Sequence, residues 1–189
     1  DVDGRRLSVT SLDKVLYPAT GTTKADVLAY YQAVAPLMVP QVAWRPVTRK
    51  RWPDGVGTED APGEVFFSKN LESFAPDWVP RFPIRHTSRT ANYPLANEAA
   101  VLAWFGQVAA LELHTPQWRF GADGEPRNPD RLVLDLDPGP GAGLPECAQV
   151  ARLCRALLDG MGMPSFPVTS GSKGRAGVEI GRASCRERV

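Results

Sequence analysis

Long hydrophobic runs are missing from this chain of 189 residues, and its cysteines do not form closely spaced pairs. No apolar run approaches the roughly 20 residues that a membrane-spanning helix needs. Residues 1–6 (Asp-Val-Asp-Gly-Arg-Arg) lack the layout of a signal peptide. These absences predict a cytoplasmic protein that has no membrane partner.

The three cysteines give no sign of a metal site. Cys147 and Cys154 are seven residues apart in a helical pattern, and Cys185 lies in the last segment of the chain. Because no Cys-x-x-Cys pair occurs, the sequence disfavours structural zinc and favours reduced thiols that serve in packing.

Charge is unevenly distributed in a composition that is otherwise typical of a globular protein, with 43% hydrophobic and 23% charged residues. Residues 1–52 carry eight Lys or Arg against four Asp. The densest basic run, Arg-Lys-Arg-Trp at residues 49–52, suits a phosphate backbone with an adjacent base to stack on. The alternative is the solvated end of a strand.

Hydrophobic spacing predicts alternating helices and strands in one α+β unit, without internal repeats or a long linker. A helix should begin at Thr23, with Asp26 completing a capping box, and should be kinked or restarted at Pro36. Strands joined by loops are expected over residues 45–85, and a helix over 97–109 that buries Leu102, Phe105 and Ala109. A helix starting near Pro145 should bury one stripe of side chains, namely Val150, Leu153, Cys154, Leu157, Leu158 and Met161.

Two carboxylates stand at the end of a predicted strand, Arg-Leu-Val-Leu-Asp-Leu-Asp at residues 131–137, which a Pro-Gly run terminates. Alternation places Asp135 and Asp137 on one face, with Cα atoms roughly 6.6 Å apart. Both could reach one hard divalent cation or bracket a pair of cations. The Asp-x-Asp pattern is itself weak: it also occurs in glycosyltransferases and phosphatases, and such a pair can simply cap the next helix.

Neighbouring motifs favour nucleotide chemistry. His114 lies on an earlier apolar segment, and a run rich in hydroxyls and glycine, Thr-Ser-Gly-Ser-Lys-Gly, follows at residues 169–174. Such a loop can offer N–H groups, hydroxyls and an ammonium group to a polyphosphate. For His114 alone, a buried histidine of the core is the alternative interpretation.

Taken together, these motifs resemble the primase-polymerase domain of bacterial ATP-dependent DNA ligase D, which acts in non-homologous end joining, and related stand-alone polymerases of actinobacteria. The likeness extends from about residue 7 to residue 174. Its motifs are residues 12–18, 21–24, 45–53, 66–67, 112–118, 135–139 and 169–174.

The resemblance implies a fold of the archaeo-eukaryotic primase-polymerase type, with mixed sheets flanked by helices, and template-directed nucleotide addition. Asp135 and Asp137 would ligate two metal ions, Mn²⁺ or Mg²⁺. His114, Ser170 and Lys173 would hold the triphosphate of an NTP or dNTP, and His114 would belong to the catalytic set. The expected partners are Ku and a ligase domain, in cis or in trans. The expected location is the cytoplasm, at the nucleoid.

The same resemblance implies recognition of a DNA end through its 5′-phosphate. Lys14, Lys24 and Lys50 match the cations that bind it, and Ser11 stands where an asparagine often assists. A hydroxyl can still donate there, with shorter reach. Phe66 and Phe67 would stack on bases near the break, although one of them should be a core residue because adjacent strand residues face opposite ways.

Beyond residue 174 the sequence departs from the family pattern. Residues 175–189 match nothing in it, and residues 179–189 look like translated sequencing adaptor, with a genuine variant terminus as the alternative. We therefore expect residues 1–174 to be an incomplete primase-polymerase domain that lacks a third metal-binding aspartate. The chain as written should be inactive and poorly stable. Two alternatives stay open: a non-catalytic module that binds 5′-phosphorylated DNA ends, and a glycosyltransferase of the Asp-x-Asp type, which would have no use for the basic aromatic segment.

Overall fold

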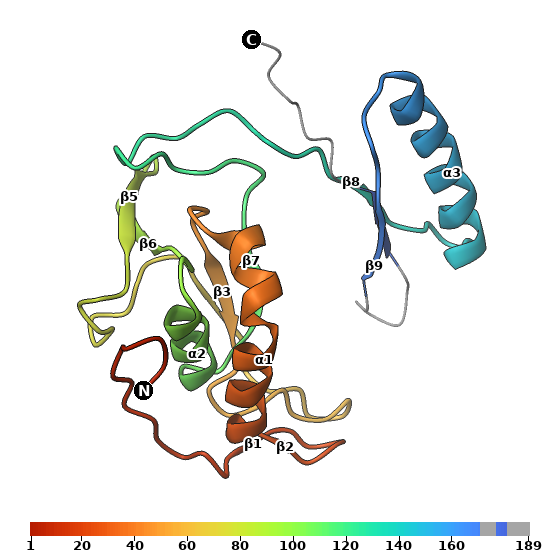
Figure 1. The fold of residues 1–189 in the computed structure, drawn as a ribbon. Helices are drawn as coiled ribbons and strands as arrows, with labels where there is room; N and C mark the ends of the chain where they lie inside the picture. Colours follow the sequence, from red (N-terminus) through yellow and green to blue (C-terminus); the bar gives the residue numbers. More distant parts are fainter. Residues whose placement is uncertain (171–176, 181–189) are drawn as a thin grey trace. The chain divides into compact units, whose positions relative to one another are not determined.

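The structure is a computed structural model that describes residues 1–170 and 177–180. The chain divides into two compact units, Asp1–Pro126 and Arg127–Val189 (Figure 1). Each unit is described by itself below. The expected boundary between residues 174 and 175 lies outside the described residues. Within them, no helix is both long enough and apolar enough to cross a membrane.

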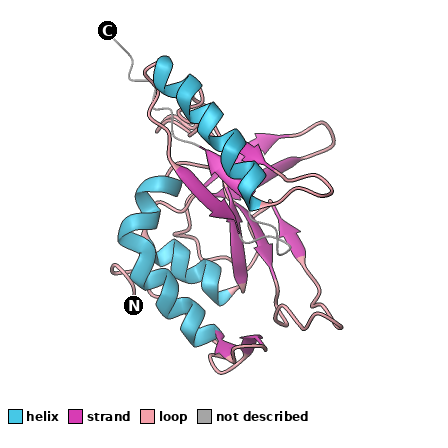
Figure 2. Cartoon of the chain, turned by 90° about the vertical axis from the view of Figure 1, so that its right-hand side faces the viewer, coloured by secondary structure: helices cyan, strands magenta, loops and turns pink. Residues whose placement is uncertain are grey.

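Helix α1 (Lys24–Val42) begins where the sequence predicts. The Thr23 side chain accepts from the Asp26 N–H, while the Asp26 carboxylate accepts from the Thr23 N–H at 2.8 Å, which completes a capping box. Of the two outcomes expected at Pro36, a kink or a restart, the restart does not occur, because α1 runs on as one helix through Pro36 and Pro40. Its packing along α2 (Ala99–Gln107) outweighs the lost hydrogen bonds, and the two helices lie side by side in Figures 1 and 2.

The strands of the first unit form small antiparallel sheets. One sheet has the order β4 (Phe66–Ser68), β3 (Thr48–Arg51) and β7 (Ala110–His114). Two hairpin-like pairs flank it, listed by their bounds: β1 (Val15–Tyr17) with β2 (Thr22–Thr23), and β5 (Arg81–Arg85) with β6 (Thr90–Pro94). The strands expected over residues 45–85 and the helix that leads into the His114 strand are confirmed.

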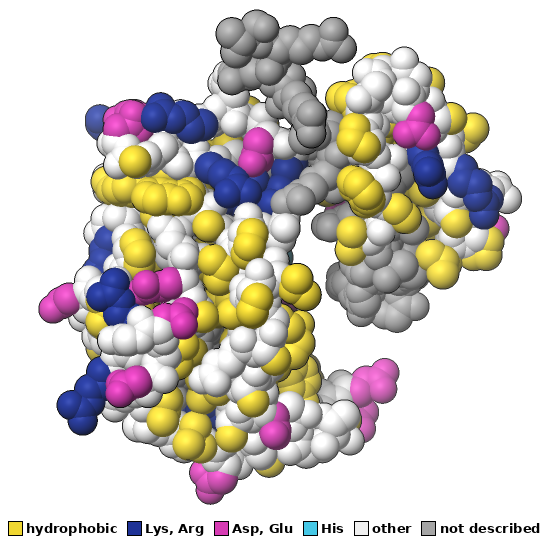
Figure 3. Space-filling view, in the orientation of Figure 1, with side chains coloured by type: hydrophobic (Ala, Val, Ile, Leu, Met, Phe, Trp, Pro, Cys, Tyr) yellow, Lys and Arg dark blue, Asp and Glu magenta, His cyan; other side chains and the backbone are white. Residues whose placement is uncertain are grey.

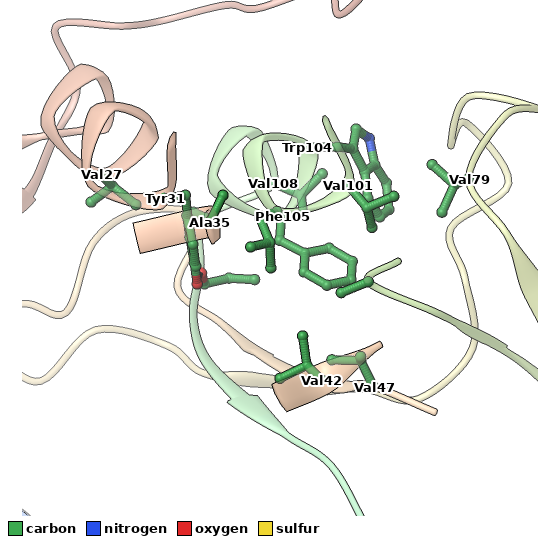
Figure 4. Close-up of a cluster of buried hydrophobic side chains, with 14 of the residues drawn as sticks. Val27, Tyr31, Ala35, Val42, Val47, Val79, Val101, Trp104, Phe105 and Val108 are labelled. Carbon is green, nitrogen blue, oxygen red and sulfur yellow. Dashed lines mark hydrogen bonds between the residues drawn. The ribbon is translucent and has the colours of Figure 1, made fainter. Parts of the chain in front are cut away.

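The core of the first unit joins α1, α2 and the sheet (Figure 4). Phe105 is fully buried, and the Tyr31 hydroxyl donates to the carbonyl of Ala110 at 2.6 Å, which ties α1 to the start of β7. Gly106 permits the close approach of the helices, since a Cβ there would lie 3.1 Å from the Tyr31 ring. Ala109 is buried as predicted. This packing fixes β7 and therefore the strand that carries His114.

The second unit contains a sheet with the order β8 (Leu134–Leu136), β10 (Gly177–Ile180) and β9 (Pro167–Ser170), and helix α3 (Leu144–Gly160). All described strand pairs are antiparallel. Helix α3 packs through Cys147 and Leu158 against Leu134 and Leu136 of β8.

The prediction that one stripe of α3 side chains is buried is wrong for most of those side chains. Leu158 is buried and Cys154 contacts the small core, but the remaining four side chains are 45–69% exposed: Val150, Leu153, Leu157 and Met161. Figure 3 shows hydrophobic side chains on the surface over α3. At 100° per residue, Cys147, Ala151, Cys154 and Leu158 form a neighbouring face, and this is the face that packs on β8.

Candidate functional site

The turn formed by residues 11–14 is fixed against the first turn of α1. The Lys24 N–H donates to the carbonyl of Lys14 at 2.8 Å, and the Ala25 N–H donates to the carbonyl of Leu12 at 2.9 Å. Together with the Thr23 cap, these bonds occupy the first N–H groups of the helix. An anion at this place would therefore be bound by side chains rather than by the helix end.

Two of the predicted phosphate ligands, Lys14 and Lys24, lie close together there. Lys24 is 7% exposed, and its ammonium group donates to the carbonyl of Thr10 at 3.1 Å. Burial, and then the positive charge of Lys14, lower the pKa of Lys24. Lys14 is more exposed and pairs with Asp54 at 2.6 Å. Ser11 begins the same turn, since its carbonyl accepts from the Lys14 N–H.

The basic run at residues 49–52 does not form a single cationic surface. Arg49 is fully buried and Arg51 largely so, and both pair with Glu72, at 3.4 and 2.7 Å. Burial lowers the pKa of Arg49 to about 10, with Glu72 acting in the opposite direction. Strand alternation turns Lys50 outward, where its ammonium lies 5.0 Å from the centre of the Trp52 ring. Of the three basic residues of this strand, Lys50 is therefore the one presented to a ligand on the outer face.

Lys50 and His114 share one carboxylate on this outer face. Glu112 Oε2 is 3.0 Å from Lys50 Nζ, and Glu112 Oε1 is 2.7 Å from His114 Nε2. The His114 side chain is 49% exposed, which excludes a buried core histidine. Burial, and then the charge of Glu112, raise the pKa of the Tyr17 phenol, so Tyr17 interacts electrostatically with the same carboxylate.

Both aromatic residues of β4 are exposed, Phe66 by 44% and Phe67 by 62%. The expectation that one of them is a core residue is wrong. Strand β4 lies at the edge of its sheet, and both of these side chains are left largely uncovered. Phe67 also lies near the predicted ligands, with its ring centre 5.5 Å from Lys50 Nζ and 6.1 Å from the His114 ring.

In the second unit, Asp135 and Asp137 are both exposed at the end of β8, while Leu134 and Leu136 pack toward Cys147 and Leu158. The two aspartates line a cavity of about 320 Å³ together with Leu136, Pro138, Gly139, Ala142, Glu146, Cys147 and Val150. They do not cap α3, whose N-cap is Gly143 and whose Glu146 accepts from the Gly143 N–H at 2.7 Å. That bond lowers the pKa of Glu146.

The predicted catalytic residues are divided between the two units. His114 belongs to the first, while Asp135 and Asp137 belong to the second. Ser170 ends β9 and its side chain lies outside the described residues, as does Lys173. Within the described part of the chain, no group of three or more His, Cys, Asp or Glu could hold a metal ion.

Sequence reasoning missed Glu112 and Glu72. Glu112 precedes His114 by two residues in a strand, so alternation alone places both on one face. Glu72 gave no such signal, because it reaches Arg49 and Arg51 from a loop beyond β4.

Comparison with known proteins identifies the family to which a chain with these features belongs. The family model described as "LigD, primase-polymerase domain" matches residues 23–176, which include both aspartates, His114 and Lys24. The chain belongs to this family. The predicted resemblance and the α+β fold are thereby confirmed.

Individual relatives of this LigD primase-polymerase chain support the same family assignment. It is 50% identical over 169 residues to a multifunctional non-homologous end joining protein LigD of Mycolicibacterium smegmatis, covering 89% of this chain and 21% of the relative. A LigD of Mycobacterium tuberculosis, described as a DNA repair protein, is 52% identical over 175 residues. This alignment covers 90% of this chain and 22% of the relative. The chain therefore spans about a fifth of these curated relatives.

A solved structure supports the same assignment. The polymerase domain from Mycobacterium tuberculosis ligase D, in complex with DNA, aligns with a TM-score of 0.84 and 49% identity. The alignment covers 93% of this chain and 60% of that one.

Proposed function

We propose that this LigD primase-polymerase chain belongs to a nucleotidyltransferase that fills or extends DNA ends, directed by a template, in bacterial non-homologous end joining. It would act on NTPs or dNTPs in the cytoplasm, at the nucleoid, with Ku and with a ligase domain in cis or in trans. One observation carries the proposal: β8 presents Asp135 and Asp137 outward beside a cavity, inside the segment that the family model matches.

Asp135 and Asp137 fit part of a site for Mn²⁺ or Mg²⁺, which oxygens of the substrate would help to complete. Both carboxylates are exposed, and no third protein carboxylate, histidine or cysteine joins them among the described residues. Hard cations of this kind are commonly held by one or two carboxylates together with phosphate oxygens and water. When bound, two such ions would activate the primer 3′-hydroxyl and neutralise charge on the triphosphate.

The other residues of the proposed site would bind and orient the nucleotide and the DNA. His114, Ser170 and Lys173 would donate to the triphosphate, and the exposed ring of Phe67 would stack on a base near the break, with Phe66 beside it. Stacking suits an enzyme that copies any template, because every base has an aromatic face.

The proposed 5′-phosphate site is built from Lys14, Lys24 and Lys50, with Ser11 assisting. Burial, and then the positive charge of Lys14, lower the pKa of Lys24, so the two ammonium groups repel each other. A phosphate dianion between them would relieve this repulsion and would compete with Asp54 for Lys14. Binding should therefore depend on the phosphate charge and weaken with salt.

Gap filling on a duplex with a 5′-phosphorylated gap tests the catalytic proposal. In a full-length LigD relative, the change that corresponds to Asp137→Asn should abolish Mn²⁺-dependent nucleotide addition, while binding of the gapped duplex persists. Retained addition by this variant would refute the role of the aspartates. The expectation that the 189-residue chain itself does not polymerise is checked in the same assay.

A second function, a module that binds 5′-phosphorylated ends without catalysis, is favoured by one observation. Lys14, Lys24 and Lys50 all lie in the first unit, which does not contain the aspartates. Phosphate-dependent DNA binding by the 189-residue chain, without nucleotide addition by the full-length protein, would support this alternative.

A further inference from the structure

A cavity of about 380 Å³ lies beside Lys24 in the first unit. The segment before Ser11 forms one of its walls and is held by Gln107, which accepts from the Thr10 N–H at 3.2 Å and donates to the Thr10 hydroxyl at 2.9 Å. Lys24 donates to the carbonyl of the same Thr10. The cavity therefore adjoins the turn of residues 11–14, which belongs to the proposed 5′-phosphate site.

The charge that lines this cavity is positive. Lys24 and Arg51 both line it, and among the described residues that do so there is no Asp or Glu. Lys24 is 7% exposed, yet its ammonium group bonds to a neutral carbonyl, and no carboxylate of the described part of the chain pairs with it. Buried charges are normally paired. An anion in the cavity would supply the missing partner.

Arg51 adds a second positive charge that its own ion pair does not cancel. Its guanidinium donates from Nε to the carbonyl of Val108 at 2.8 Å and from Nη1 to Glu72 at 2.7 Å, which leaves Nη2 for a ligand. Glu72 is shared with Arg49, so one carboxylate serves two guanidinium groups. Arg49 is fully buried, whereas Arg51 lines the cavity. The surplus positive charge of this cluster therefore reaches the cavity through Arg51.

Much of the remaining wall is apolar, and it includes one exposed ring. Phe74 is 68% exposed and lines the cavity with Pro53 and Pro76. The loop that carries Phe74 is fastened to Arg51 by Glu72, two residues earlier. An aromatic ring at the edge of a basic cavity is a stacking platform for a base. The volume is within the range of small-molecule sites, about 300–1,000 Å³, and a phosphate alone would leave most of it unfilled.

We propose that this cavity receives an adenosine monophosphate group joined through a pyrophosphate bond to the 5′ end that Lys14 and Lys24 hold. A 5′-adenylated end of this kind is the activated form in ATP-dependent ligation, and the inference rests on the proposed function, which joins end recognition to a ligase. Each phosphate of the pyrophosphate carries one negative charge. Lys14 and Lys24 would bind the phosphate nearer the DNA, Arg51 would bind the phosphate of the adenylate, and Phe74 would stack on the adenine. The chain would then keep its hold on an end after activation.

Fluorescence anisotropy with the 189-residue chain tests this on gapped duplexes whose 5′ end carries a hydroxyl, a phosphate, a triphosphate or an adenylate. The adenylated duplex should bind about fivefold more tightly than the phosphorylated one, because one more base is stacked and one more phosphate is paired. Phe74→Ala should remove most of this gain and leave the ratio between phosphate and hydroxyl unchanged, which also shows that the variant is folded. Tyr30→Ala, at a ring of the first unit that is 62% exposed and lies outside the cavity, should behave as the wild type.

Failure of the cavity and failure of end recognition give different results. Equal binding of the hydroxyl and phosphate ends would refute the proposed end recognition, and the inference with it. A preference for phosphate without tighter binding of the adenylate would overturn the inference alone, because the cavity would then not receive the added group. A gain that the triphosphate reproduces, or that Phe74→Ala leaves in place, would mean that no adenosine is stacked there, which also overturns the inference.

Discussion

The two units differ in how firmly they support their candidate residues. In the first, the described core joins two helices and a sheet, and even the charged Lys24 and Arg49 are buried. In the second, Cys147 and Leu158 are the buried core residues among those described. The lysines proposed to bind phosphate therefore stand on an extensive packed core, while Asp135 and Asp137 project from a strand that packs, among the described residues, on a smaller one. We therefore expect the candidate side chains of the first unit to be held in their binding geometry before a ligand arrives.

The largest expected effect tests this difference in packing. Phe105→Ala removes a fully buried ring and should lower the free energy of unfolding of the first unit by about 3–5 kcal/mol. Leu158→Ala acts on the smaller core and should cost about 2 kcal/mol in the second unit. Leu157→Ala, at a side chain that is 69% exposed, is the matched control and should change stability by less than about 0.5 kcal/mol.

Two probes distinguish the units in one urea titration. All five tryptophans lie between residues 44 and 118, so their fluorescence reports on the first unit alone. Far-ultraviolet circular dichroism reports on both, because α3 lies in the second. Leu158→Ala should shift the midpoint of the dichroism transition and leave the midpoint of the fluorescence transition unchanged. A common shift of both probes would show that the units unfold together and would break the comparison.

A smaller effect tests whether end recognition belongs to the first unit. Lys24→Gln keeps a donor for the Thr10 carbonyl but removes the charge, so the preference for a 5′-phosphate over a 5′-hydroxyl should fall about tenfold. Fluorescence anisotropy with the two duplexes measures this ratio. Lys69→Gln, at an exposed lysine that is not part of the proposed site, should leave it unchanged. An equal loss in both variants would indicate general electrostatics instead of a site.

Local sequence signals predicted the elements that carry the site. The capping box of Thr23 and Asp26 sets the start of α1, and strand alternation places Asp135 and Asp137 together outside β8. Such features depend on residues a few positions apart, so the sequence contains all of the information. The side on which Lys50 projects follows from the same alternation.

Features that depend on tertiary packing were not predictable in this way. The continuity of α1 through Pro36 depends on contacts with α2, and the exposure of Leu157 depends on which face of α3 meets β8. The exposure of both phenylalanines of β4 depends on what packs over the two faces of that strand. Glu72 pairs with arginines about 20 residues away, a choice that the linear pattern does not record.

The smallest effect compares the two carboxylates that cap helices, Asp26 in the first unit and Glu146 in the second. The backbone N–H of Thr23 lowers the pKa of Asp26, and the backbone N–H of Gly143 lowers that of Glu146. A carboxyl group whose pKa is lower in the folded state stabilises the fold above its unfolded pKa, about 4. This contribution is lost as the pH falls through the folded pKa.

Asp26→Asn and Glu146→Gln should therefore destabilise the chain slightly at pH 6, and the difference from the wild type should shrink toward pH 3. Tryptophan fluorescence follows the first variant and circular dichroism follows the second, each as a urea midpoint measured across this range. The Thr23 hydroxyl also donates to Asp26, whereas Gly143 has no side chain with which to complete its box. Because both carboxylates are solvent-exposed, salt should weaken the dependence on pH. A difference that stays constant from pH 6 to pH 3 would mean that the amide variants disturb packing, and that the capping charges do not act as the shifted pKa values indicate.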